Sequence, residues 1–143
     1  MPVQKGSETE MSYRKWTPVP RKVKAKEGGE AYALKSQSKA AIMENNLQDH
    51  VLMEREILMQ LDHPFIIKLI CAFQDTRYVY FLLALLIGGE LFTFLRKHQR
   101  FSEPTTKICS AGVILGFEHM HAKKIACRDL KPENLVLARD GYL

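Results

Sequence analysis

The chain has 143 residues, of which 46% are hydrophobic and 26% are charged, and this composition excludes fibrous and intrinsically disordered proteins. Length and composition together predict one ordinary globular domain. The formal net charge of +5 suits an acidic partner such as a nucleotide phosphate, but a charge of this size does not by itself indicate a nucleic-acid partner, and we expect none.

Three features of the chain indicate a reducing compartment, no membrane span and no signal peptide. The three cysteines, Cys71, Cys109 and Cys127, are widely spaced, which favours free thiols over a disulfide framework. The longest apolar run, Tyr78 to Ile87, is too short to cross a bilayer as a helix. The N-terminus lacks the apolar core of a signal peptide. We therefore expect a cytoplasmic or nuclear protein.

Residues 1–30 differ from the rest of the chain. They contain scattered prolines and polar residues, and the run from Arg14 to Lys26 holds six Lys or Arg and no acidic residue. No hydrophobic period is visible there, so we predict a basic flexible arm over 1–30 and a folded domain over 31–143.

The folded part begins with an alternating pattern, "AYALKS", in which Ala33 and Lys35 share one face of a predicted strand. Asn45 or Asn46 is the expected N-cap of the first helix, and Ser102 that of the last. In chain order, the patterns predict a strand at 31–36, a helix at 46–61, strands at 65–74 and 78–86, a short helix ending near Arg96, a helix at 103–122, and a hairpin that begins at "LVL" and turns at Asp140-Gly141.

Glu54 interrupts an apolar stripe on the predicted helix 46–61. The stripe consists of Leu47, Val51, Leu58 and Leu61, which recur at helical spacing. A carboxylate on a buried face is costly unless it is paired, and Lys35 on the preceding strand is the candidate partner. The alternative is that the helix is rotated, so that Glu54 lies at the rim of the core.

The stretch "RDLKPEN", Arg128 to Asn134, resembles the catalytic loop of protein kinases. Other segments follow in the family's order: "AYALK" resembles the strand with the phosphate-binding lysine, "HVLMEREIL" the helix with its paired glutamate, and "HPFIIKL" and "GGELF" stand where the family has them. The resemblance covers about 31–143. The stretches "GGEL", "EPTTK" and "RDLKPENL" are most similar to the cyclic-nucleotide-dependent (AGC) group of kinases, in particular the cGMP-dependent type. It implies an α+β, protein-kinase-like fold that is truncated, with a partial small lobe and the start of the helical large lobe.

The resemblance also implies roles for residues in phosphoryl transfer from ATP, with Mg²⁺, to Ser or Thr. Asp129 resembles the residue that orients the substrate hydroxyl and accepts its proton, and Lys131 the cation that neutralises the γ-phosphate. Asn134 resembles a magnesium ligand. Lys35, tethered by Glu54, would hold the α- and β-phosphates, while Ala33 and Val136 would enclose the adenine ring. Glu90 and Glu133 match positions that contact arginines ahead of the target residue, so the implied substrate is a basic peptide.

Some family features do not appear in this sequence. The glycine-rich phosphate loop is expected about 20 residues before Lys35, but residues 11–20 contain no glycine. The D-F-G motif is expected roughly 18 residues after Asp129, beyond Leu143. Cys127 stands where the family has His or Tyr, and Ala84 where this group often has an acid. Three interpretations stay open: a kinase whose isolated chain is inactive, a non-catalytic form that binds kinase partners or regulators, and a fragmentary gene product.

Overall fold

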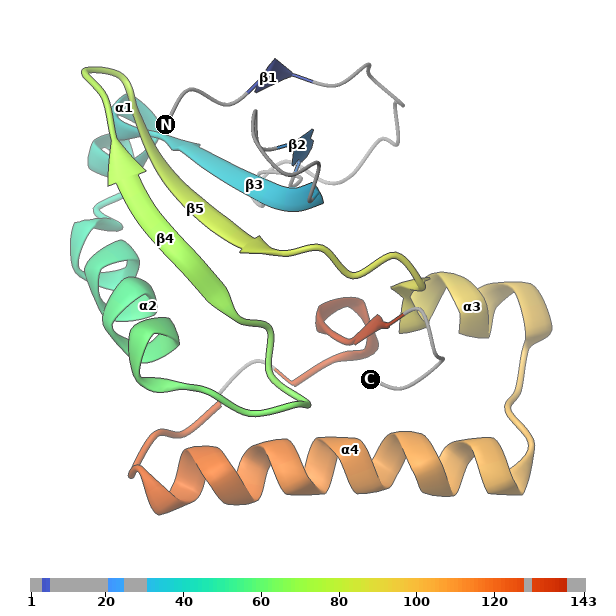
Figure 1. The fold of residues 1–143 in the computed structure, drawn as a ribbon. Coiled ribbons are helices and arrows are strands. Elements are labelled where there is room, and N and C mark those ends of the chain that lie inside the picture. The colour runs from blue at the N-terminus through green and yellow to red at the C-terminus, as the bar shows by residue number, and fades with distance from the viewer. Residues whose placement is uncertain (1–3, 6–20, 25–30, 128–129, 139–143) are drawn as a thin grey trace. The chain divides into compact units, whose positions relative to one another are not determined.

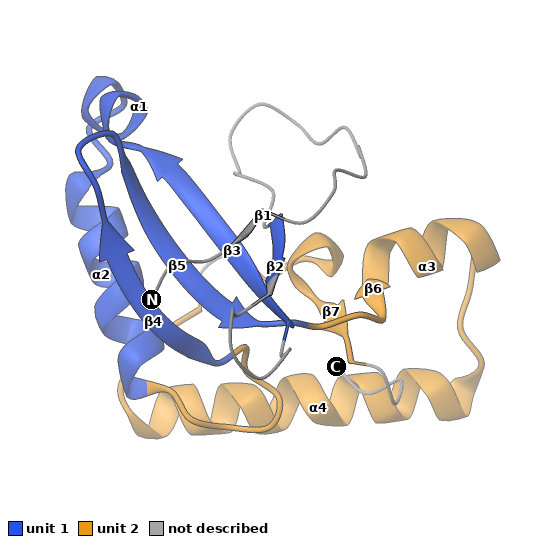
Figure 2. Cartoon of the chain, turned by 45° about the horizontal axis from the view of Figure 1, so that its top comes forward, with its two compact units in different colours: residues 1–60, 68–85 blue, residues 61–67, 86–143 orange. Residues whose placement is uncertain are grey.

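A computed structural model describes residues 4–5, 21–24, 31–127 and 130–138 of the chain (Figure 1). The chain divides into two compact units, the first formed by residues 1–60 and 68–85 and the second by residues 61–67 and 86–143 (Figure 2). Helices and strands occur in both units, as the α+β prediction requires. No helix within the described ranges is both long and apolar enough to cross a membrane.

Unit 1 is built on a five-stranded antiparallel sheet with the strand order β1-β2-β3-β5-β4. Its long central strands, β3 and β5, pair over seven residues each, from Tyr32 opposite Ala84 to Ser38 opposite Tyr78. The strands are β1 (Gln4–Lys5), β2 (Arg21–Lys24), β3 (Ala31–Ser38), β4 (Leu69–Gln74) and β5 (Tyr78–Ala84).

The core of unit 1 lies on β5, which pairs with β3 on one side and with β4 on the other. Phe81 is fully buried, and Leu82 and Leu83 beside it are also buried. Three consecutive buried residues in one strand mean that both faces of the sheet are covered at this point. The apolar run that contains them is therefore a buried strand, as its length and composition predict.

Two helices lie between β3 and β4 where a single one was predicted: α1 (Lys39–Glu44) and α2 (Gln48–Gln60). The predicted N-cap at Asn45 or Asn46 is wrong. Asn45 instead ends α1, and Asn46 takes a left-handed φ of 54°, a conformation that asparagine tolerates better than most residues. The turn so formed delays the start of α2 to Gln48.

The N-terminal boundary of regular structure also differs from the sequence prediction. No strand was expected before Ala31, yet β2 pairs with β3 through Val23 opposite Tyr32, and Val23 is buried. The rest of the predicted flexible arm, residues 1–3, 6–20 and 25–30, lies outside the described residues.

Unit 2 contains two helices, a short turn of 3-10 helix and a two-stranded ribbon. Helix α4 matches its predicted bounds, because Ser102 accepts a hydrogen bond from the Thr105 backbone N–H and Pro104 occupies the first turn. The elements are β6 (Gly89–Glu90), α3 (Leu91–His98), α4 (Glu103–Ala122), η1 (Pro132–Asn134) and β7 (Val136–Leu137), with β6 antiparallel to β7.

Residues 65–68 were predicted to open a strand, but β4 begins only at Leu69. The preceding segment turns, and the backbone N–H of Phe65 donates to Nδ1 of His63 at 3.2 Å. The His63 ring stacks on His119 of α4, with ring centroids 5.0 Å apart, so this segment belongs to unit 2. The strand prediction failed because the apolar residues there pack in unit 2 and not in the sheet.

The turn between β4 and β5 is organised by one carboxylate. Asp75 accepts hydrogen bonds from the backbone N–H groups of Arg77 and Tyr78, both at 2.7 Å, and from the Tyr80 hydroxyl at 2.8 Å. The two backbone hydrogen bonds are the main cause of the lowered pKa of Asp75, and the bond from the Tyr80 hydroxyl adds to it. The same hydroxyl–carboxylate bond raises the pKa of Tyr80.

These pKa shifts predict how the turn responds to pH. Because the pKa of Asp75 is lower in the folded chain, its contribution to stability is present above the ordinary value of 3.8 and is lost as the pH falls through the lowered value. The contribution of Tyr80 is present below pH 10.0 and is lost as the pH rises through the raised pKa. We expect Asp75→Asn to lower the pKa of Tyr80. Ultraviolet absorbance titration measures this pKa, and the Tyr80→Phe variant identifies which part of the absorbance change belongs to Tyr80. An unchanged Tyr80 titration would contradict this account of the turn.

Candidate functional site

The first part of the candidate site is an ion pair in unit 1. The Nζ atom of Lys35 lies 2.6 Å from Oε1 of Glu54, joining β3 to α2. The contact is a charge-assisted hydrogen bond between an ammonium and a carboxylate. The pairing predicted for Lys35 and Glu54 from strand alternation and the helical stripe is therefore confirmed.

The sheet fixes the position of Lys35. It lies directly opposite Phe81 in the pairing of β3 with β5, and its Nζ is 5.7 Å from the centre of the Phe81 ring. Phe81 is fully buried, so the ring beneath the Lys35 ammonium belongs to the core of unit 1. Ala33 shares the face of Lys35 two residues earlier, since side chains alternate along a strand.

The ion pair is only partly shielded from water. The side chain of Lys35 is 19% exposed and that of Glu54 is 36% exposed, and no residue of α2, all of which is described, is buried. The predicted stripe is therefore shallow within α2, with Leu47 before the helix exposed and Leu61 just after it buried. The two sequence alternatives are both partly right, because Glu54 pairs with Lys35 and also lies at the edge of the core.

Such a pair does little for stability, since exposed ion pairs contribute about 0–1 kcal/mol. Its main effect is to hold the Lys35 ammonium in one place. That ammonium keeps further hydrogen-bonding capacity and enough exposure to reach an anion.

The second part of the candidate site is a short segment of unit 2, residues 130–138, that follows the predicted catalytic aspartate. It turns through η1, where the Asn134 backbone N–H donates to the Lys131 carbonyl at 2.9 Å, and then enters β7. Glu90 lies opposite Val136 in the pairing of β6 with β7. Both β6 and α3 contact η1.

The structure therefore assembles five of the predicted site residues in this segment and its neighbouring strand. Glu133 is exposed, whereas Glu90 and Val136 are half-buried. The five are Glu90, Lys131, Glu133, Asn134 and Val136. Arg128 and Asp129 lie outside the described residues. Ala33, Lys35 and Glu54 form the other set, in unit 1.

Gly88 is a residue of the site that sequence reasoning did not single out. Its backbone N–H donates to the Leu137 carbonyl at 2.9 Å, and a Cβ at this position would lie 2.4 Å from the same oxygen and 2.5 Å from that of Ala138. Only glycine permits this approach without displacing backbone. The signal in the sequence was the Gly-Gly pair itself, immediately after the apolar strand.

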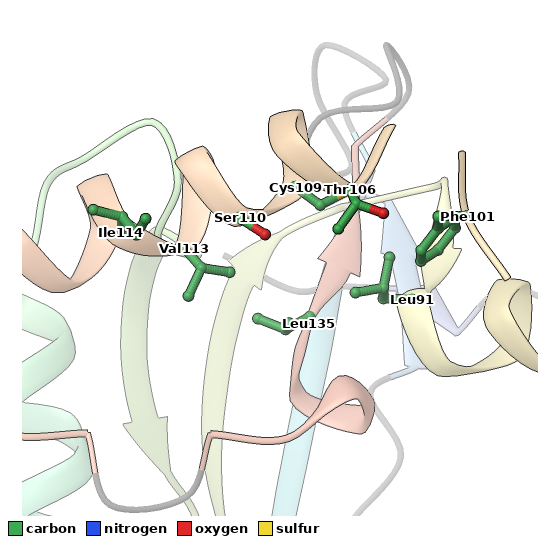
Figure 3. Close-up of a pocket in the computed structure, with 8 residues that line it drawn as sticks. All are labelled: Leu91, Phe101, Thr106, Cys109, Ser110, Val113, Ile114 and Leu135. Carbon is green, nitrogen blue, oxygen red and sulfur yellow. The ribbon is translucent and has the colours of Figure 1, made fainter. Parts of the chain in front are cut away.

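A separate pocket of about 280 Å³ opens in unit 2 (Figure 3). Its wall is mostly apolar and comes from α3, the loop after α3, α4 and the segment before β7. It includes none of the predicted site residues. The lining residues are Leu91, Phe101, Thr106, Cys109, Ser110, Val113, Ile114 and Leu135. Burial raises the pKa of the Cys109 thiol, which favours its neutral form.

The site elements match a known family of proteins. Residues 19–143 match the family profile described as "Protein kinase domain". The match covers most of the chain and includes both parts of the candidate site. The chain therefore belongs to the protein kinase family.

Individual relatives agree with this assignment. Over 121 residues, or 85% of this chain, it is 47% identical to cGMP-dependent protein kinase 2 of Mus musculus, 42% to the RAC family serine/threonine-protein kinase homolog of Dictyostelium discoideum, and 40% to cAMP-dependent protein kinase type 3 of Saccharomyces cerevisiae. These similarities support the resemblance to the cyclic-nucleotide-dependent (AGC) group of serine/threonine kinases. The matched region spans 16%, 27% and 30% of the lengths of these three relatives.

Proposed function

We propose that this chain forms part of a serine/threonine protein kinase that transfers the γ-phosphate of ATP to a hydroxyl in a basic peptide. The observation that carries the proposal is the 2.6 Å contact between Lys35 and Glu54. In the kinase mechanism, a strand lysine paired with a helix glutamate is the arrangement that holds the nucleotide phosphates in place. The proposed location is the cytoplasm or the nucleus.

The chemistry of the available groups fits a nucleotide and its metal. Lys35 is a fixed cation with partial exposure, as binding of a phosphate requires. Asn134 offers an amide oxygen, a ligand type that Mg²⁺ accepts. When bound, Mg-ATP supplies the phosphoryl group and the metal charge that offsets the charge on its oxygens. Ala33 and Val136 are the small apolar residues that we assign to the adenine ring.

The remaining roles follow the catalytic-loop motif. Asp129 accepts the proton of the substrate hydroxyl, and Lys131 binds the transferred phosphate. Glu90 belongs to β6 and Glu133 to η1, and these two elements contact each other. Two acidic residues on adjoining elements suit the arginines of a basic substrate.

We further propose that a polypeptide of these 143 residues, by itself, transfers phosphate at no more than the background rate. The sequence contains neither a G-x-G-x-x-G loop nor a D-F-G motif. Phosphoryl transfer depends almost entirely on positioning and electrostatics, so the loss of each element costs several kcal/mol, and about 1.4 kcal/mol corresponds to a tenfold change in rate.

A phosphotransfer assay with Mg-ATP and an arginine-rich peptide tests this proposal. We expect the purified chain and its Asp129→Asn variant to give the same signal as a reaction without protein. Transfer above background that disappears in Asp129→Asn would contradict the proposed inactivity, and would mean that residues 1–30 or a partner supply the absent groups.

A further inference from the structure

The ring of Phe81 is a second contact of the Lys35 ammonium, in addition to the carboxylate of Glu54. The Lys35 Nζ lies over this ring, 5.7 Å from its centre, and 2.6 Å from Oε1 of Glu54. A separation below about 6 Å is within the range at which the negative face of an aromatic ring attracts a cation. One nitrogen is therefore held by groups of two different elements, α2 and β5.

The aromatic residue on this face of β5 is the one that stands opposite the lysine. Side chains alternate along a strand, so Val79, Phe81 and Leu83 share one face of β5. Phe81 pairs with Lys35, and its two neighbours on that face are aliphatic. An aliphatic side chain also fills a core, but it lacks the charge distribution that attracts an ammonium. The position of the ring therefore indicates a role beyond filling the core.

The two contacts of Lys35 differ in what fixes them. Phe81 is fully buried, and its strand pairs with β3 over seven residues, so the sheet itself keeps the ring beneath the ammonium. Glu54 reaches the same nitrogen from α2, so that contact depends on the position of the helix. The ring is thus an anchor for Lys35 that does not depend on α2.

We propose that Phe81 is a positioning residue for Lys35, and that its ring holds the ammonium in place to receive a nucleotide phosphate. The inference rests on the proposed role of Lys35 in binding ATP. An ammonium has three N–H donors, and one of them serves Glu54. The ring attracts the charge as a whole, so the other donors stay available to phosphate oxygens. A lysine already held in place loses less rotamer freedom on binding, which raises the affinity.

Fluorination of Phe81 tests this role, because fluorine withdraws negative charge from the ring face while the ring stays apolar and nearly the same size. We expect the affinity for Mg-ATP, measured by isothermal titration, to fall from phenylalanine through difluorophenylalanine to pentafluorophenylalanine at this position, by about threefold in all. Adenosine has no phosphate for Lys35 to bind and should bind all three proteins equally. A residue that only fills the core produces neither the order nor the difference between ligands.

Phe73 supplies the matched control in the neighbouring strand, β4. It is 42% exposed, and its ring stacks on Tyr80 with the centroids 4.9 Å apart. The same fluorinated residues at position 73 should leave the affinity for Mg-ATP unchanged. In a Glu54→Gln background, fluorination of Phe81 should have a larger effect than in the unaltered chain, since the ring is then the main anchor of Lys35. Thermal unfolding verifies that each protein is folded, and the difluoro variant carries the test if the pentafluoro variant is not.

A measurement without nucleotide separates this inference from the proposed function. Nuclear magnetic relaxation of an isotope-labelled ε-carbon of Lys35, identified by its loss in Lys35→Met, should report greater motion when Phe81 is pentafluorinated. If the unaltered chain does not bind Mg-ATP, the proposed function fails, and the relaxation measurement alone decides whether Phe81 holds Lys35. Unchanged motion of Lys35, or equal affinity for Mg-ATP throughout the fluorinated series, would overturn the inference.

Discussion

Replacing Gly88 with alanine is expected to destabilise unit 2 by about 3 kcal/mol, the upper part of the usual range for overpacking. The added methyl group would lie 2.4 Å from the Leu137 oxygen and 2.7 Å from its carbonyl carbon. Both are backbone atoms, so no side-chain rotation relieves the clash. The strands must separate, which breaks the hydrogen bond from the Gly88 N–H and weakens that from Leu91 to the Leu135 carbonyl.

The neighbouring glycine provides the control. Gly89 has a φ of +81°, and nothing lies within 4 Å of a Cβ placed there. Gly89→Ala therefore carries only the cost of a left-handed backbone, about 1–2 kcal/mol. Urea denaturation compares the two variants, and hydrogen exchange at the Leu91 amide reports whether the ribbon has opened. Equal stability of the two variants, with a protected Leu91 amide in both, would contradict the close approach of Gly88 to β7.

Replacing Lys35 with methionine is expected to reduce the affinity for Mg-ATP at least about tenfold, since charge-assisted hydrogen bonds to a phosphate contribute roughly 1.5–3 kcal/mol. Methionine keeps the unbranched apolar stem that rests on Phe81, so the sheet should retain its packing. Glu54→Gln should have a smaller effect in the same direction, because Lys35 keeps its charge but loses the anionic partner that positions it. Thermal unfolding should change little in either variant, as the pair is partly exposed.

Much of the fold could be predicted where local signals coincide. The start of helix α4 was placed correctly because Ser102 and Pro104 mark it. The buried strand β5 was evident from its apolar run. In both cases the local preference of the sequence agrees with the tertiary environment.

The errors fall where distant residues decide the structure. Strand β2 has three basic residues around Val23, and its pairing with β1 and β3 makes it a strand. Helix α1 has six residues, too few for a visible period, and depends on Ser38 as its cap. A segment of either kind carries no reliable pattern of its own.

The candidate site shows the same division. Strand alternation and helical spacing made Lys35 and Glu54 candidate partners but left a rotated helix open, and the resemblance to kinases favoured the pair. The closeness of Gly88 to Leu137 joins residues far apart in the sequence, and no local pattern encodes such a backbone contact. The kinase motif identified the residues of the catalytic segment, but not the glycine against which that segment packs.

The central claim, that Lys35 is a nucleotide-binding residue of a protein kinase domain, is tested most directly by isothermal titration of Mg-ATP into three proteins. These are the unaltered chain, Lys35→Met, and Lys97→Met, which removes the same charge from an exposed position near the end of α3. We predict that the unaltered chain and Lys97→Met bind with the same weak affinity, and that Lys35→Met binds at least about tenfold more weakly. Equal binding by all three proteins, or binding by none, would contradict the assignment of Lys35 to the nucleotide phosphates.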